Sequence, residues 1–202
     1  MPIQVNPFGL ACGGFGACIQ QPDVSDQLDS LGDRLMYRLA YRNFGDHQSW
    51  VVSHSVTSAS GQVGMRWYEF RASAGSTNLG VYQQGTFAPD GAFRWMGSAA
   101  MDKAGNIALG YSLSSTTVHP SIYFTGRSAG DALGTMAGEQ AILIGGGSQY
   151  DTAARWGDYT SLALDPNDEC TFWYTNQYYK GPTPDAFNWS TALQAIRFKN
   201  CR

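Results

Sequence analysis

Three arginines recur along the chain at nearly equal intervals. Arg34, Arg94 and Arg155 are separated by 60 and 61 residues. A guanidinium group can donate two parallel hydrogen bonds to a carboxylate or a sulfate, so arginines that converge in a fold can hold an acidic ligand. We therefore expect these three side chains to form an arc at one mouth of a binding site. The alternative is that each arginine pairs with a neighbouring aspartate or carbonyl and holds the structure together.

Aromatic side chains accompany the same arginines. Trp95 and Trp156 directly follow two of them, and Tyr37 lies three residues after the first. Aromatic rings in a funnel can stack on a sugar ring or an acyl chain. We expect these residues to contribute to the binding of a carbohydrate or a small anionic ligand, the alternative being that the tryptophans pack one repeated unit against the next.

Two short segments contain groups suited to acid–base or nucleophilic chemistry. Asp158 and Tyr159 follow Arg155, and Tyr68 is adjacent to Glu69. A carboxylate can act as a general acid or base, and a tyrosine can act as a nucleophile when a base activates it. Adjacent residues of a strand point to opposite faces, so Tyr68 and Glu69 are not expected to touch. The catalytic candidates are Asp158, Tyr159 and Glu69, for a hydrolase of the glycosidase-like or ester and lactone type.

One acidic turn offers oxygen ligands for a metal ion. Asp165, Asn167 and Asp168 lie within four residues, and Ca²⁺ prefers carboxylate and amide oxygens. We expect either a calcium site or a solvated hairpin turn. The three histidines have no spacing that defines a metal pair, and we expect them to be structural.

A repeat of about sixty residues organises the elements that must position these groups. The segments 99–111 and 161–174 align so that Asp102 and Tyr111 match Asp165 and Tyr174. Each unit contains apolar strands separated by Gly/Asp turns, and four strands per unit is the pattern of a β-propeller blade. We expect an N-terminal arm (1–30) followed by blades at 31–91, 92–152 and 153–202. A β-sandwich is the structural alternative.

The third unit differs from the other two, because it has only three clear strands, the last at 192–198. We expect its outer strand to be missing or to come from elsewhere, with the N-terminal arm as the candidate donor. Three blades are fewer than the four to eight that usually close a propeller. We therefore expect a homodimer in which two copies complete a six-bladed ring, or further blades in a longer protein.

The segment Asp102-Lys103-Ala104-Gly105-Asn106-Ile107-Ala108-Leu109-Gly110-Tyr111-Ser112 resembles the sialidase-like, or BNR-repeat, propellers of large secreted bacterial proteins. The resemblance covers roughly residues 31–202. It implies a channel lined by the first strand of each blade. It also implies an arginine grip on a substrate carboxylate, a tyrosine nucleophile activated by a glutamate, and an aspartate as general acid.

The bulk composition narrows the class of partner. Charged residues make up only 14% of the chain, aromatic residues 13%, and glycine occurs 24 times, which favours short strands and tight turns. A net charge of −3 offers no basic surface for nucleic acid or for an anionic membrane. Apolar runs such as 141–144 are far too short to span a membrane as a helix. We expect neither nucleic acid nor membrane as a partner.

The four cysteines indicate the compartment. Their layout suits two local disulfides, Cys12–Cys18 and Cys170–Cys201, and structural disulfides persist in oxidising compartments. The alternative is four reduced thiols in the cytosol. Two disulfides favour a secreted or periplasmic protein. Residues 1–4 lack the features of a signal peptide, so we expect the export signal to have been removed or this chain to be a piece of a longer protein.

The leading functional expectation is a ligand-binding module, with a secreted hydrolase or a structural and adhesive module as alternatives.

Overall fold

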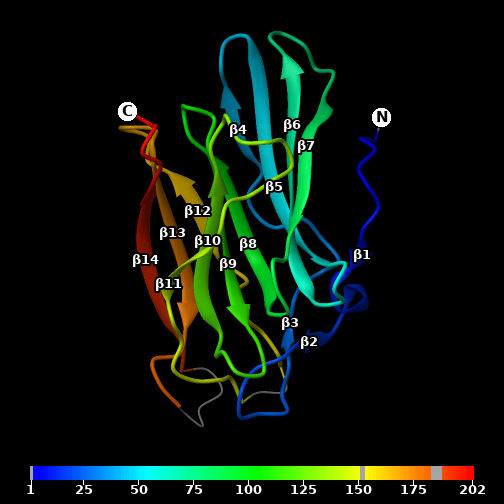
Figure 1. The fold of residues 1–202 in the computed structure, drawn as a ribbon, viewed down its shortest axis with the longest axis vertical. Coiled ribbons are helices and arrows are strands. Elements are labelled where there is room, and N and C mark those ends of the chain that lie inside the picture. Colours follow the sequence, from blue (N-terminus) through cyan, green and yellow to red (C-terminus); the bar gives the residue numbers. More distant parts are fainter. Residues whose placement is uncertain (1, 151–152, 183–187) are drawn as a thin grey trace.

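The computed structural model describes residues 2–150, 153–182 and 188–202, and it is an all-β structure (Figure 1). Three larger antiparallel sheets lie side by side, and none of them closes into a barrel. The described part of the chain contains no α-helix, only a short 3-10 helix η1 (Ala11–Gly14). It therefore has no helix long and apolar enough to cross a membrane.

The first sheet combines a four-stranded meander with one strand from the N-terminal arm. Its order is β1-β5-β6-β7, and β4 also pairs with β5. β4 lies opposite residues 48–51 of β5 and β1 lies opposite residues 56–57, so the two short strands share one edge. The strands are β1 (Gly9–Leu10), β4 (Ala40–Asn43), β5 (His47–Thr57), β6 (Val63–Ser73) and β7 (Gly80–Phe87).

The second and third sheets are simple meanders of consecutive strands. The second contains β8 (Phe93–Met101), β9 (Ile107–Ser114), β10 (Ser121–Arg127) and β11 (Gln140–Leu143). The third contains only β12 (Ser161–Leu164), β13 (Thr171–Tyr178) and β14 (Ser190–Arg197). A small separate sheet pairs β2 (Ala17–Ile19) with β3 (Leu28–Asp29).

The second sheet is packed on both faces, because it lies between the other two (Figure 1). Side chains of a strand alternate between faces, so Leu109 and Tyr111 of β9 join the cluster with the first sheet, whereas Ala108 joins the cluster with the third. Gly110 also faces the third sheet, where a β-carbon would lie 2.5 Å from the ring of Tyr174. The apolar runs of the middle unit thus reflect burial on two sides.

The N-terminal arm lies against the first sheet, not the third. β1 pairs with β5, the Phe8 ring meets His54 edge-on at 4.7 Å, and the backbone N–H of Asn6 donates to Gln84. The arm therefore contributes a strand and a cover to the first sheet (Figure 1). Our expectation that it supplies the outer strand of the third unit is wrong for this reason, and the third sheet ends at β14.

Both expected disulfides are present. Cys12–Cys18 closes a loop in the arm, and Cys170–Cys201 joins the start of β13 to the chain that follows β14. No cysteine is free. Two structural disulfides are consistent with an extracellular or otherwise oxidising environment.

A histidine is buried beneath the arm. His54 is only 4% exposed, and its Nε2 lies 3.0 Å from the hydroxyl of Tyr68. Burial, aided by the charge of Arg66, lowers the pKa of His54 from 6.5 to about 4. Burial also raises the pKa of Tyr68, so both side chains are neutral at pH 7.

This burial predicts how stability depends on pH. Between about pH 4 and 6.5 the unfolded chain binds a proton at His54 that the folded chain excludes, so stability falls as pH falls through this window. The full shift corresponds to about 3 kcal/mol. Urea unfolding should show the advantage of wild type over His54→Gln shrinking by most of that amount between pH 7 and 4. His119→Gln, at a half-buried site, serves as the control, and a constant advantage of wild type would contradict the assignment.

Candidate functional site

The first strands of the three sheets lie next to one another. β8 contacts β4 on one side and β12 on the other. Ser98 of β8 connects the chain before β4 to β12, since its Oγ donates to the carbonyl of Tyr37 at 3.5 Å and accepts the N–H of Leu162 at 2.9 Å. We call the surface formed by residues 34–42 and 155–169, with the buried residues 98–101 of β8 beneath it, the inner surface.

The inner surface contains a small hollow of about 280 Å³. Apolar side chains of all three first strands contribute to it, including Ala40, Ala100 and Leu162. Charged and aromatic side chains complete its lining: Arg38, Tyr41, Arg42 and Glu169. The hollow is therefore small and mixed in character, with charged groups beside an apolar base.

Arg42 and Glu169 link the first unit to the third beside the hollow. Both terminal nitrogens of Arg42 lie 3.0–3.1 Å from one oxygen of Glu169, and the guanidinium also lies over the ring of Phe44. The Arg42 side chain is only 13% exposed, whereas that of Glu169 is 51% exposed. This pair fixes one side of the hollow and leaves the Glu169 side chain half exposed.

Arg38 is the least constrained cation of the inner surface. Its guanidinium lies 5.4 Å from the ring centre of Tyr37, and both residues are exposed. Within the described ranges it has no hydrogen-bond or ion-pair partner. Neighbouring exposed side chains add apolar area: Leu35, Leu39 and Tyr41. A free guanidinium on an aromatic ring is suited to meet an acidic group or a sugar face.

Arg34 and Arg155 lie at the other end of the same surface. Arg34 is paired with Asp33 at 2.7 Å, and Arg155 is paired with Asp158. The hydrogen bond with Asp33 raises the pKa of Arg34, and the charges of Asp29 and Asp158 contribute to the same shift. Arg34 and the Arg155–Asp158 pair are therefore close enough to interact electrostatically.

The expected arc needs correction at Arg94, because its side chain is entirely buried. Its guanidinium donates to Glu139 at 2.8 and 2.5 Å, to Asp90 at 2.8 Å and to the carbonyl of Ala92 at 3.0 Å. Burial alone would lower the pKa of Arg94, but the hydrogen bonds with Glu139 and Asp90 raise it. This environment matches the alternative stated above, an arginine that holds the structure together.

Trp95 and Trp156 are also interior residues. They are 0% and 1% exposed and belong to one cluster that joins the arm to the second and third units. The indole N–H of Trp156 donates to Ser112 at 3.1 Å. The packing alternative fits both tryptophans, and of the expected aromatic residues only Tyr37 is exposed, at 71%.

The catalytic candidates are not assembled into one site. Glu69 is 0% exposed and accepts hydrogen bonds from Ser49, Arg71 and Gln83, all in the first sheet. Tyr159 is 94% exposed, and the carboxylate of Asp158 is paired with Arg155. The three therefore offer no acid–base pair around a common pocket.

The acidic turn uses its oxygens internally. Asp165 accepts the N–H of Asn167 and the indole N–H of Trp173, at 2.9 and 3.0 Å. Asp168 accepts from the hydroxyl and N–H of Thr171 and from the N–H of Cys170, which lowers its pKa to about 2. Among the described residues no group of three His, Cys, Asp or Glu side chains could hold a metal ion.

Three residues of the inner surface were not candidates from the sequence: the exposed Arg38, Tyr41 and Arg42. The sequence does contain a signal for this surface. Arg38, Ala40 and Arg42 are spaced two residues apart, the period that places side chains on one face of a strand. The regular spacing of the three arginines favours the start of each unit instead.

No protein-family model, curated protein or solved structure matches this chain.

Proposed function

We propose that this chain is a non-enzymatic recognition module that binds a carbohydrate or a small anionic ligand on its inner surface. The observation that carries the proposal is the exposed Arg38–Tyr37 pair beside a hollow to which the first strands of all three sheets contribute. Arg34 and Arg155 are further guanidinium groups of this surface, and in this proposal each exchanges its aspartate neighbour for an acidic group of the ligand.

The three sheets are, in this proposal, adjacent blades of a β-propeller. Their consecutive meanders and the side-by-side position of β4, β8 and β12 support it, because the first strands of propeller blades line a central channel. The outer face of the third sheet exposes Trp173 and Leu193. A second copy or further blades would cover that face. Light scattering would detect a second copy as a mass of twice the 21.9 kDa monomer.

Binding is favoured over hydrolysis because one candidate acid is buried and the other is held in an ion pair. Glu69 is sealed within the first sheet, and Asp158 is paired with Arg155. A hydrolase needs two groups that reach one substrate bond. The two disulfides support an extracellular or periplasmic location, where carbohydrates and organic acids are accessible ligands.

An array of immobilised acidic glycans, each paired with its neutral counterpart, tests the proposal. The array should include sialylated, uronic-acid and sulfated oligosaccharides. We expect wild type to bind acidic members, and Arg38→Ala to lose at least tenfold in affinity, since losing a charge-assisted hydrogen bond costs about 1.5–3 kcal/mol. Tyr37→Ala should weaken acidic and neutral members alike, because it removes the stacking face.

Arg202→Ala is the matched control, since it removes an exposed arginine outside the inner surface. Equal binding by Arg38→Ala and wild type would place the ligand elsewhere. Turnover of chromogenic glycosides or esters, assayed with and without EDTA, would replace the binding proposal with a hydrolase.

A further inference from the structure

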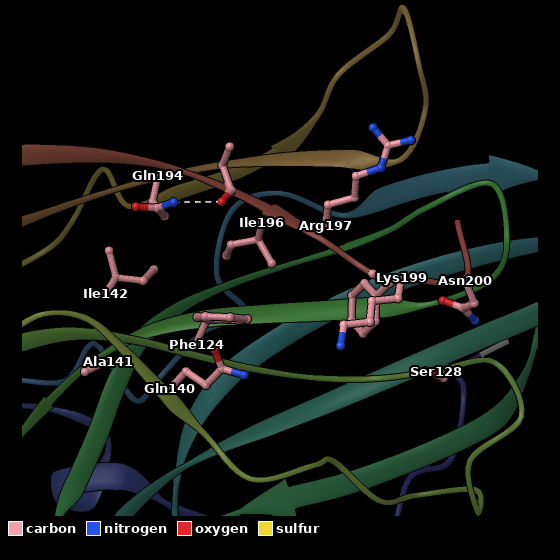
Figure 2. A pocket seen from close by; sticks show the side chains of 12 residues that line it. Phe124, Ser128, Gln140, Ala141, Ile142, Gln194, Ile196, Arg197, Lys199 and Asn200 are labelled. Carbon is pink, nitrogen blue, oxygen red and sulfur yellow. Dashed lines mark hydrogen bonds between the residues drawn. The ribbon is translucent and has the colours of Figure 1, made fainter. Parts of the chain in front are cut away.

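A groove of about 770 Å³ lies between the second and third sheets, away from the inner surface (Figure 2). Phe124 and Ile142 line it from the second sheet, and Ile196 lines it from β14. Figure 2 shows Ile196 and Phe124 on facing walls, with Gln140 and Gln194 beside them. The groove therefore has apolar walls and amide groups placed between two different sheets.

The groove exists because the third sheet lacks a fourth strand. The second sheet continues past β10 to β11, but the third stops at β14. Gln140 pairs with Phe124 and shares its face, which is the face turned toward the third sheet. Within the described residues no strand lies beyond β14 to cover this part of β11.

β14 presents an unprotected edge to the groove. All eight of its residues pair with β13 on one side, and no described strand pairs with the other. Natural edge strands are usually blocked by a proline, a bulge or a central charge. β14 has no proline, its pairing shows no register shift, and its one charged residue, Arg197, is at its end.

Cationic groups are placed at one end of this edge. Arg197 is paired with Asp168 at 3.1 Å, yet its side chain is 50% exposed. Lys199 is exposed, lines the groove, and has no ion-pair partner in the part of the chain that the structure describes. A carboxylate on an occupant of the groove would be complementary to this end.

We propose that β14 accepts an extended segment of a partner protein as the fourth strand of the third sheet. The segment runs antiparallel to β14, as every other strand of the sheet does to its neighbour. Its N-terminal end therefore lies beside Arg197 and Lys199 and carries an acidic residue. Alternate apolar side chains then face Phe124 and Ile142, and main-chain hydrogen bonds supply the remaining affinity.

The second sheet provides a model for this partner. β11 runs antiparallel to β10, as the proposed segment does to β14, and it is preceded by Glu139, whose cationic partner is Arg94. Residues 137–144 read Ala-Gly-Glu-Gln-Ala-Ile-Leu-Ile, an acidic residue followed by an apolar strand. A peptide of this sequence has the pattern that the groove requires, and we use it as the probe.

Fluorescence anisotropy with this labelled, end-blocked peptide tests the proposal, using the intact protein. We expect saturable binding and slower hydrogen exchange in β14. Two peptides N-methylated at alternate residues separate strand addition from simple apolar contact. The peptide methylated on the N–H groups that face β14 should bind at least tenfold more weakly than the unmethylated parent. The peptide methylated on the N–H groups that face away from β14 should bind as the parent does.

Substitutions test the charge at the end of the groove. Lys199→Glu should weaken the parent peptide at least tenfold, but should barely affect a peptide with glutamine in place of its glutamate. Lys180→Glu, exposed outside the groove, is the control.

Three results would overturn the proposal. Absence of saturable binding would show that the edge does not accept this type of strand. Equal binding of both N-methylated peptides would show an apolar pocket without strand pairing. A dimer in light scattering with β14 protected from exchange before peptide is added would identify a second copy of the chain as the occupant.

Discussion

Replacing Arg94 with methionine is expected to destabilise the protein by about 3 kcal/mol, because it leaves the carboxylate of Glu139 without its cation. The Glu139 side chain is only 17% exposed, and among the described residues its other hydrogen-bond donor is the phenol of Tyr111. For a chain of this length the loss corresponds to a fall in Tm of about 6–12 °C. Thermal and urea unfolding measure it.

Two controls separate this structural role from a binding role. Arg34→Met removes an exposed arginine and should change stability by less than about 0.5 kcal/mol. Arg94→Met combined with Glu139→Met removes both charges and should recover part of the loss. An Arg94→Met protein with wild-type stability and impaired binding of acidic ligands would contradict the assignment of Arg94 to the interior.

Loss of the Cys170–Cys201 disulfide has the second large expected effect. The two cysteines are 31 residues apart, and cross-linking a loop of that size stabilises a fold by about 4 kcal/mol in the chain-entropy description. The double variant Cys170→Ser/Cys201→Ser should lose this contribution. It also frees the chain that follows β14 from the start of β13, so the third sheet should show the largest increase in hydrogen exchange.

The other disulfide provides an internal comparison. Cys12 and Cys18 are 6 residues apart, so Cys12→Ser/Cys18→Ser should cost only about 2 kcal/mol. Urea unfolding of both double variants gives the ranking. A larger loss for Cys12→Ser/Cys18→Ser than for Cys170→Ser/Cys201→Ser would contradict this ranking.

The sequence predicted the strands well because turns and strands have local signals. Gly/Asp turns divide the chain into apolar segments, and the three-stranded character of the third unit followed from counting them. The disulfide pairs were predicted for a similar reason, since each joins cysteines that are close in the sequence or border neighbouring strands. These features depend on short-range chain geometry.

The destination of the N-terminal arm could not be read in the same way. The pairing of β1 with β5 joins Leu10 to Val56, and nothing in the local sequence distinguishes that edge from the edge of β14. The contact of Phe8 with His54 is equally non-local. Long-range pairing depends on which edge and which face remain uncovered after the sheets have packed.

The candidate site was predicted only in part, because spacing does not reveal burial. Arg34, Arg94 and Arg155 are equivalent in spacing, yet only Arg94 has a partner far away in the sequence, Glu139, in addition to the nearby Asp90. Arg38 is exposed on the inner surface and has no ion-pair partner among the described residues. Whether a guanidinium is a structural tie or a free binding group is decided by tertiary neighbours.

Backbone amide NMR during titration with an acidic oligosaccharide identified on the array is the most direct test of the proposed function. We predict chemical-shift changes confined to residues 34–42, 98–101 and 155–169, which form the inner surface, and their loss in Arg38→Ala at the same ligand concentration. Changes centred on residues 124–142 and 190–200, the walls of the groove beside β14, with an undisturbed inner surface, would contradict the account.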